Sequence, residues 1–149
     1  MISYRFLDKN DLALILPIEN ECFIDPFKES DLLYELTENP VNKIIGVFDD
    51  TSLVGFVDYM ITFNSATITQ IAVTKSYRNK GLATSLLEKM EETFPRDIDD
   101  VVETITLEVR ESNVAAQKLY LKNGYEVVLT KKNYYRDGEN AIYMIKRRF

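Results

Sequence analysis

Two cations and a glycine stand where a helix is expected to begin, in the stretch YRNKGLATSLLEKM at residues 77–90. Arg78 and Lys80 lie at the end of the helix where the helix dipole favours anions, and the first backbone amides of a helix have no partner within it. Gly81 has no Cβ, so a ligand can approach the main chain closely. These features could bind a phosphate group, although solvated cations at an ordinary helix start would give the same pattern. The stretch is neither a Walker loop nor the three-glycine dinucleotide fingerprint.

Two further side chains are of types that move protons. In VVETITLEV, residues 101–109, the apolar residues alternate, and Glu108 lies on the other face. Its carboxylate could accept a proton from an amine or simply be solvated. Tyr120 follows Asn113 by two helical turns, so both are expected to project from one helix face. The Tyr120 phenol could donate a proton, or the ring could only pack the helix against a sheet.

Composition excludes several classes of function. The formal net charge of -6 argues against a nucleic-acid-binding protein but permits a basic partner. The chain has no histidine, which excludes Ser–His and Cys–His mechanisms and most zinc sites, and we expect no metal. The single cysteine, Cys22, allows no internal disulfide, indicates a reducing compartment and is expected to be a small core residue rather than a nucleophile.

The chain has no segment typical of membrane insertion or export. The longest apolar run, Leu12 to Ile18, is too short to span a bilayer and contains Pro17. The N-terminal residues lack the basic-then-apolar pattern of a signal peptide. We therefore expect a cytoplasmic protein with no membrane partner, and the length of 149 residues predicts one domain over residues 1–149.

The pattern of apolar residues predicts a mixed order of strands and helices. Pro17 is expected to kink or end the first helix, and Asp137-Gly138 indicates a hairpin turn. The order predicts an α/β protein with a central sheet and helices on its faces. Strands are expected over residues 2–7, 42–50, 53–64, 66–74, 101–109, 125–135 and 140–149, and helices over 11–23, 28–38, 112–124 and from 82 to the residue before Pro95.

Three separated motifs resemble one known family. RNKGLA matches the Arg/Gln-x-x-Gly-x-Gly/Ala signature of the GNAT superfamily of N-acetyltransferases, with Arg78, Gly81 and Ala83 at the fixed positions. LEVRESNVAAQKLYLKNGYE (107–126) and KNYYRDGENAIYM (132–144) resemble the RimI-like branch, the bacterial ribosomal-protein-alanine N-acetyltransferases. The segment ECFIDPF also resembles that branch.

The resemblance implies a fold and a donor site. It implies a mixed, mostly antiparallel sheet of about seven strands, with about four helices on its faces and acetyl-CoA in a cleft where two parallel strands splay apart. Asn113 would hydrogen-bond the pantetheine region, and Arg78 holds the first position of the signature. By resemblance, main-chain groups of Ile71, Ala72 and Val73 face the acetyl-pantetheine arm, and those of Asn79, Lys80, Gly81, Leu82, Ala83 and Thr84 hold the pyrophosphate.

The resemblance also implies roles for the proton-moving side chains. Glu108 matches the general base of the family, and Tyr120 matches the general acid that returns a proton to the CoA thiolate. Tyr134 and Tyr135 match tyrosines that line the peptide entrance, although cross-strand packing would also explain them. Asn140 stands where the branch usually has an acidic residue, so the peptide preference could differ.

The predicted function is direct transfer of an acetyl group from acetyl-CoA to the N-terminal α-amine of a protein. By resemblance the acceptor is a basic ribosomal protein that begins with alanine. A lysine, a polyamine or another small amine stays open as the acceptor, because one fold serves all of these. An acyl-CoA-binding module without turnover is a further alternative, and the sequence does not indicate an oligomeric state.

Overall fold

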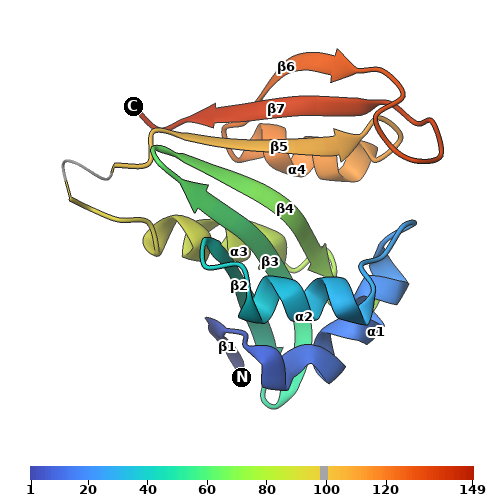
Figure 1. Ribbon diagram of the computed structural model, residues 1–149, viewed down its shortest axis with the longest axis vertical. Helices are drawn as coiled ribbons and strands as arrows, with labels where there is room; N and C mark the ends of the chain where they lie inside the picture. Colours follow the sequence, from blue (N-terminus) through green and yellow to red (C-terminus); the bar gives the residue numbers. More distant parts are fainter. Residues whose placement is uncertain (98–100) are drawn as a thin grey trace. The chain divides into compact units, whose positions relative to one another are not determined.

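The computed structural model describes residues 1–97 and 101–149 (Figure 1). These residues include seven strands and four α-helices. The strands are β1 Ile2–Phe6, β2 Asn42–Asp49, β3 Ser52–Thr62, β4 Ser65–Val73, β5 Thr104–Arg110, β6 Glu126–Lys131 and β7 Ala141–Arg147, and the helices are α1 Leu12–Cys22, α2 Glu29–Thr37, α3 Leu82–Glu92 and α4 Val114–Lys122.

The strands form one mixed sheet in the order β1-β2-β3-β4-β5-β7-β6. The pairs β1–β2, β2–β3, β5–β7 and β6–β7 are antiparallel. β4 and β5 are parallel and pair over three positions, Ser65–Thr67 with Thr104–Thr106. The predicted class, a mostly antiparallel sheet of seven strands with four helices, is confirmed.

The chain divides into two compact units. Unit 1 comprises Met1–Met60 and Gln70–Phe94, and unit 2 comprises Ile61–Thr69 and Pro95–Phe149. In unit 1, α1 and α2 cover one face of the strands (Figure 1), where Ile15, Leu32 and Phe56 belong to one buried core. Because side chains alternate along a strand, Tyr59 of β3 faces the other side, where its ring packs edge-on against Phe94 beyond α3.

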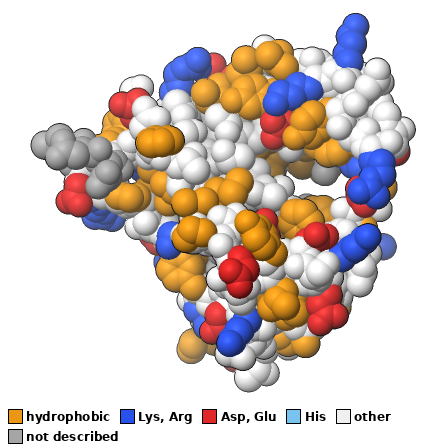
Figure 2. Space-filling view, in the orientation of Figure 1, with side chains coloured by type: hydrophobic (Ala, Val, Ile, Leu, Met, Phe, Trp, Pro, Cys, Tyr) orange, Lys and Arg blue, Asp and Glu red, His pale blue; other side chains and the backbone are white. Residues whose placement is uncertain are grey.

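Unit 2 contains β5, β7 and β6 with α4 beside β5 (Figure 1). Along β5, Ile105, Leu107 and Val109 are buried while Glu108 is only partly buried, which confirms the predicted alternation. β6 is the edge strand next to β7, at the opposite end of the strand order from β1. Figure 2 shows hydrophobic side chains gathered over β6, at the top of the view, where Val127, Val128 and Leu129 are exposed.

The structure excludes one of the two alternatives at Pro17 and shortens the strand predicted from residue 101. Pro17 does not end the first helix, since α1 continues to Cys22. β5 begins at Thr104 and not at residue 101. A proline inside a helix removes one backbone donor, and packing of the following turn, where Ile18 and Glu19 are buried, maintains the helix.

The connection between β6 and β7 is a longer loop than predicted. β6 ends at Lys131, which pairs with Ala141, so residues 132–140 form the loop. The prediction of a strand through residue 135 is therefore wrong. Asn133 takes a positive φ of 53°, which ends the extended backbone. The Asn140 side-chain oxygen accepts a hydrogen bond from the Asn133 amide at 2.9 Å, so this residue closes the loop.

Candidate functional site

The start of α3 has the geometry expected of a main-chain anion site. Gly81 is the N-cap with a left-handed φ of 78°, and Asn79 before it has a φ of 63°. A Cβ built on Gly81 would meet no atom within 4 Å, so the space beside this main chain is open. The Ser85 amide donates to the Gly81 carbonyl at 3.0 Å. The amides before Ser85 belong to the first turn of α3, and their N–H groups point out of the N-terminal end of the helix. The residues at this helix start fit a phosphate group.

The two cations of the signature have protein partners. Arg78 donates from Nε to the Val73 carbonyl at 2.9 Å, and its Nη2 lies 3.5 Å from the Cys22 sulfur. Lys80 lies over the Tyr77 ring, with Nζ 5.0 Å from the ring centroid. The Arg78 guanidinium thus joins the end of β4 to the start of α3, a role that the sequence pattern did not indicate. Lys80 is exposed and would be available to an anion.

Close packing holds the end of β4, where the acetyl-pantetheine arm is predicted to lie. A Cβ on Gly55 of β3 would come within 2.6 Å of the Ala72 carbonyl oxygen and 3.3 Å of the Val73 Cα. Only glycine allows this approach of the main chains. Cys22 lies beside Val73, and burial raises the pKa of its thiol, so it is not a thiolate at neutral pH. Sequence reasoning missed Gly55, although a glycine inside a strand is a known signal for close backbone approach.

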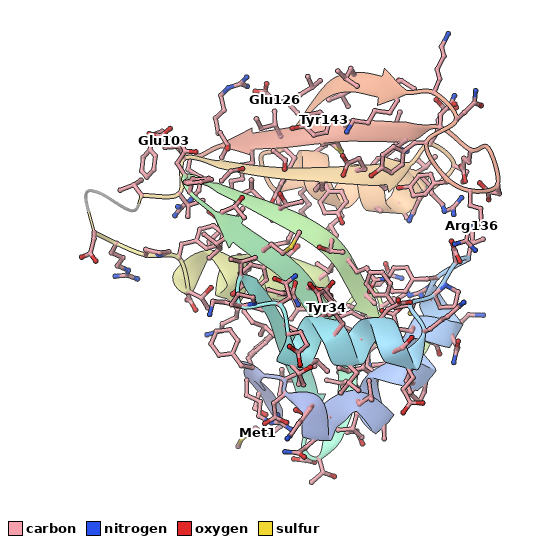
Figure 3. All side chains as sticks on the ribbon, viewed as in Figure 1. Met1, Tyr34, Glu103, Glu126, Arg136 and Tyr143 are labelled. Atoms are coloured by element: carbon pink, nitrogen blue, oxygen red, sulfur yellow. The ribbon has the colours of Figure 1, made fainter. Side chains whose placement is uncertain are left out.

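In unit 2, Glu108 carries a lysine partner. Its Oε1 accepts from Lys131 Nζ at 2.7 Å, and the side chains of Lys131 and Glu108 are 37% and 22% exposed. Tyr143, which is labelled in Figure 3, lies on β7. It is the cross-strand neighbour of Glu108. The Lys131 Nζ lies 4.7 Å from the centroid of the Tyr143 ring. Its hydrogen bond to Glu108 raises the pKa of Lys131, so this lysine stays protonated. The sequence analysis missed both Lys131 and Tyr143, because their position depends on strand register.

Tyr120 and Asn113 belong to α4 and its start. Tyr120 is buried, and its ring packs edge-on against Tyr125 with centroids 5.5 Å apart. Burial, and next the nearby Tyr135, raise the pKa of the Tyr120 phenol, which is therefore protonated at neutral pH. Asn113 is the N-cap of α4, and its Oδ1 accepts from the Ala116 amide at 3.1 Å. The ring thus packs against Tyr125, and a protonated phenol also suits an acid.

The loop that carries Tyr134 and Tyr135 is held by a salt-bridge network. Arg110 Nη1 donates to Glu139 Oε1 at 2.9 Å, and its guanidinium lies 4.1 Å from the centroid of the Tyr135 ring. Glu139 also accepts from the Ser112 amide at 2.8 Å. Hydrogen bonds from Ser112 and Arg110 lower the pKa of Glu139 to about 2. Sequence reasoning missed Arg110 and Glu139, both of which fix this loop.

Within residues 1–97 and 101–149, no group of three or more His, Cys, Asp or Glu side chains could hold a metal ion. No helix in the same ranges is long and apolar enough to cross a membrane.

Comparisons with known proteins identify the family. The model of the Acetyltransferase (GNAT) family matches residues 12–125. The ribosomal protein bS18-alanine N-acetyltransferase of Escherichia coli (strain K12) is 31% identical over 151 residues, covering 97% of this chain and 96% of that protein. The N-alpha-acetyltransferase of Saccharolobus solfataricus is 38% identical over 109 residues, covering 65% of this chain and 64% of that protein. The chain belongs to the GNAT acetyltransferase family and is an N-acetyltransferase.

Solved structures share its fold. The crystal structure of the Escherichia coli ribosomal-protein-S18-alanine N-acetyltransferase has a TM-score of 0.86 and 29% identity, and covers 99% of this chain and 94% of that chain. Arabidopsis thaliana NAA60 in complex with acetyl-CoA has a TM-score of 0.88 at 16% identity and covers 99% of both chains, which is a likeness of fold alone. The predicted family, fold class and acetyltransferase activity with acetyl-CoA as the co-substrate are confirmed at the level of the family.

Proposed function

We propose that this chain is a single acetyltransferase domain that transfers the acetyl group of acetyl-CoA to the N-terminal α-amine of a protein, of the ribosomal-protein-alanine type. The observation that carries the proposal is the partly exposed Glu108 carboxylate beside an ordered loop with two tyrosines. The Escherichia coli and Saccharolobus relatives, whose names describe acetylation at alanine and at an α-amine, support the choice of acceptor. The net charge of -6 is compatible with a basic protein as substrate.

The donor is proposed to bind mainly to the main chain in unit 1. The amides between Asn79 and Thr84 would hold the pyrophosphate, since Gly81 leaves open space there. By the family resemblance, the main chain of Ile71–Val73 would face the acetyl-pantetheine arm, and Asn113 would bond the pantetheine region. Acetyl-CoA supplies an activated thioester, so positioning of the two substrates accounts for much of the expected rate increase.

Glu108 and Tyr120 are proposed to transfer the protons. An N-terminal amine has a pKa of about 8 and is mostly protonated at neutral pH. The Glu108 carboxylate would take a proton from this ammonium group, directly or through one water molecule. The neutral amine then attacks the thioester carbonyl, the carbon–sulfur bond breaks, and the Tyr120 phenol gives a proton to the departing thiolate. The raised pKa of Tyr120 keeps the phenol protonated for this step.

Mass spectrometry of a matched peptide panel tests this function. The panel contains a basic peptide that begins with alanine, the same peptide with a blocked N-terminus and an internal lysine, and spermidine, each incubated with acetyl-CoA. We expect acetylation at the free α-amine only. Acetylation of the lysine or of spermidine alone would refute the α-amine acceptor. Glu108→Gln should abolish most of the turnover, whereas Glu111→Gln, at an exposed glutamate three residues further on, should not.

A further inference from the structure

The Lys131 ammonium lies in a group of side chains suited to binding a cation. Its Nζ is 2.7 Å from Glu108 Oε1 and lies over two tyrosine rings, 4.7 Å from the Tyr143 centroid and 5.4 Å from the Tyr134 centroid. A carboxylate with aromatic faces is a common arrangement for an ammonium ion, since the charge and the ring quadrupoles both attract it. We call Glu108, Tyr134 and Tyr143 the ammonium box.

Strand register brings these side chains together. Glu108 of β5 is opposite Tyr143 of β7, and Tyr143 is in turn opposite Leu129 of β6. Lys131 follows Leu129 by two residues, so both lie on the same face of the sheet. The box is therefore built from adjacent strands and from the loop that Arg110 and Glu139 hold, while Lys131 reaches it from the edge strand.

Lys131 is not confined to the box. Its side chain is 37% exposed, and a lysine has a long flexible stem that can extend into solvent. A partly exposed Lys–Glu pair contributes little, so another ammonium group could replace it. The box itself is more firmly fixed, because two of its members are strand residues and Tyr134 packs edge-on against Tyr135 at 5.0 Å between centroids.

We propose that the ammonium box is the binding site for the acceptor's ammonium group and that Lys131 fills it until the acceptor displaces it. The proposal rests on the proposed function, because an N-terminal α-ammonium must approach Glu108 to lose its proton there. Lys131 is thus an internal competitor that determines specificity: an acceptor has to bind the box better than a tethered lysine does. The apparent affinity for the acceptor is lowered by the fraction of molecules in which Lys131 occupies the box.

Steady-state kinetics with matched lysine variants measure this competition. Lys131→Met keeps the length of the side chain and removes the charge. It should lower the KM for the alanine peptide about fivefold, as expected for removal of a weak competing pair, with the KM for acetyl-CoA unchanged. Lys131→Arg keeps a cation and should behave like the wild type. Lys132→Met makes the same charge change at an exposed neighbour and should have no effect.

Binding of ethylammonium tests the box without turnover. Tyrosine ring resonances are followed by NMR while ethylammonium chloride is added to the wild type, to Lys131→Met and to Lys131→Met with Glu108→Gln. Binding about fivefold tighter in Lys131→Met than in the wild type, lost in the double variant, is expected. Equal binding in all three proteins, or a Lys131→Met enzyme whose kcat falls while the acceptor KM stays constant, would overturn the proposal. If ethylammonium binds as expected but no α-amine is acetylated, the box stands and the proposed acceptor is wrong.

Discussion

Replacing Asp58 with asparagine is expected to stabilise the protein at neutral pH and to flatten the pH dependence of its unfolding free energy. Asp58 lies on β3, and its side chain is fully buried. Neither of its carboxylate oxygens has a hydrogen-bond partner among the described residues. Burial, and next the charge of Glu35, raise the pKa of Asp58 from its ordinary value of 3.8 to about 8. Asn42 is near enough to oppose this shift in part, without the geometry of a hydrogen bond.

The direction of the effect follows from proton binding. The folded protein holds a proton on Asp58 up to a pH of about 8, whereas the unfolded chain loses it near 3.8. The stabilisation that the folded protein gains from holding this proton is therefore complete below about pH 3.8 and decreases as the pH rises toward 8. One pKa unit corresponds to about 1.4 kcal/mol, so the unfolding free energy should fall by about 3 kcal/mol between pH 5 and pH 7. This is a large share of the roughly 5–15 kcal/mol that stabilises a typical domain.

Urea denaturation at pH 5, 6, 7 and 8 measures the slope. The wild type should lose stability over this range, and Asp58→Asn, which cannot ionise, should lose much less. Glu19 is a second buried carboxyl group whose pKa is raised, first by burial, so part of the slope should remain in Asp58→Asn and disappear when Glu19→Gln is added. Asp25→Asn, at an exposed aspartate, is the control. Parallel curves for the wild type and Asp58→Asn would refute the reasoning.

The remaining predictions concern the donor side and the reaction. Gly81→Ala should raise the KM for acetyl-CoA about tenfold, because a Cβ strains the left-handed backbone and enters the open space; an unchanged KM would remove Gly81 from the donor site. Gly55→Ala should lower stability in thermal denaturation by about 1–3 kcal/mol, since its Cβ would overlap the Ala72 carbonyl, and an unchanged Tm would contradict this. Glu108→Gln should lower kcat most at neutral pH, and a pH profile identical to the wild type would exclude it as the base. Glu139→Gln should raise the acceptor KM by loosening the tyrosine loop, and a selective rise in the acetyl-CoA KM would argue against that role.

Much of the fold could be predicted because it follows from local patterns. The alternation along β5 places Glu108 on the face opposite Ile105 and Leu107 whatever the neighbouring strands are. Helical spacing and a following proline likewise indicate α3 without knowledge of its partners. The tyrosines of KKNYY favour a strand and predict one through residue 135, but β6 ends at Lys131, and the backbone of Asn133 takes a left-handed conformation. Residue type alone does not show such a turn, since most asparagines are not left-handed.

The partners of charged side chains could not be predicted from the sequence. The interpretation of Arg78 and Lys80 as anion ligands used only their position at a helix start, whereas Arg78 donates to the Val73 carbonyl. The pair of Lys131 with Glu108 joins β6 to β5 across β7, so it depends on strand order and on two registers. Neither the order nor the register is encoded in the spacing of single residues along the chain.

The difference between local patterns and partners set by strand order explains why the sequence predicts a donor site in more detail than an acceptor site. A donor site made of main-chain amides, as proposed for the start of α3, would require few particular side chains, chiefly a glycine where the backbone is left-handed, and a short motif around Gly81 is enough to predict it. The proposed acceptor site depends on the side chains of Lys131, Tyr134 and Tyr143, which come from different strands and a loop. Substitutions there would leave the motif intact and, under the proposal, still change which ammonium group can displace Lys131. Acceptor choice should therefore vary among chains that share the donor motif, and the charge at position 131 is the first place to test it.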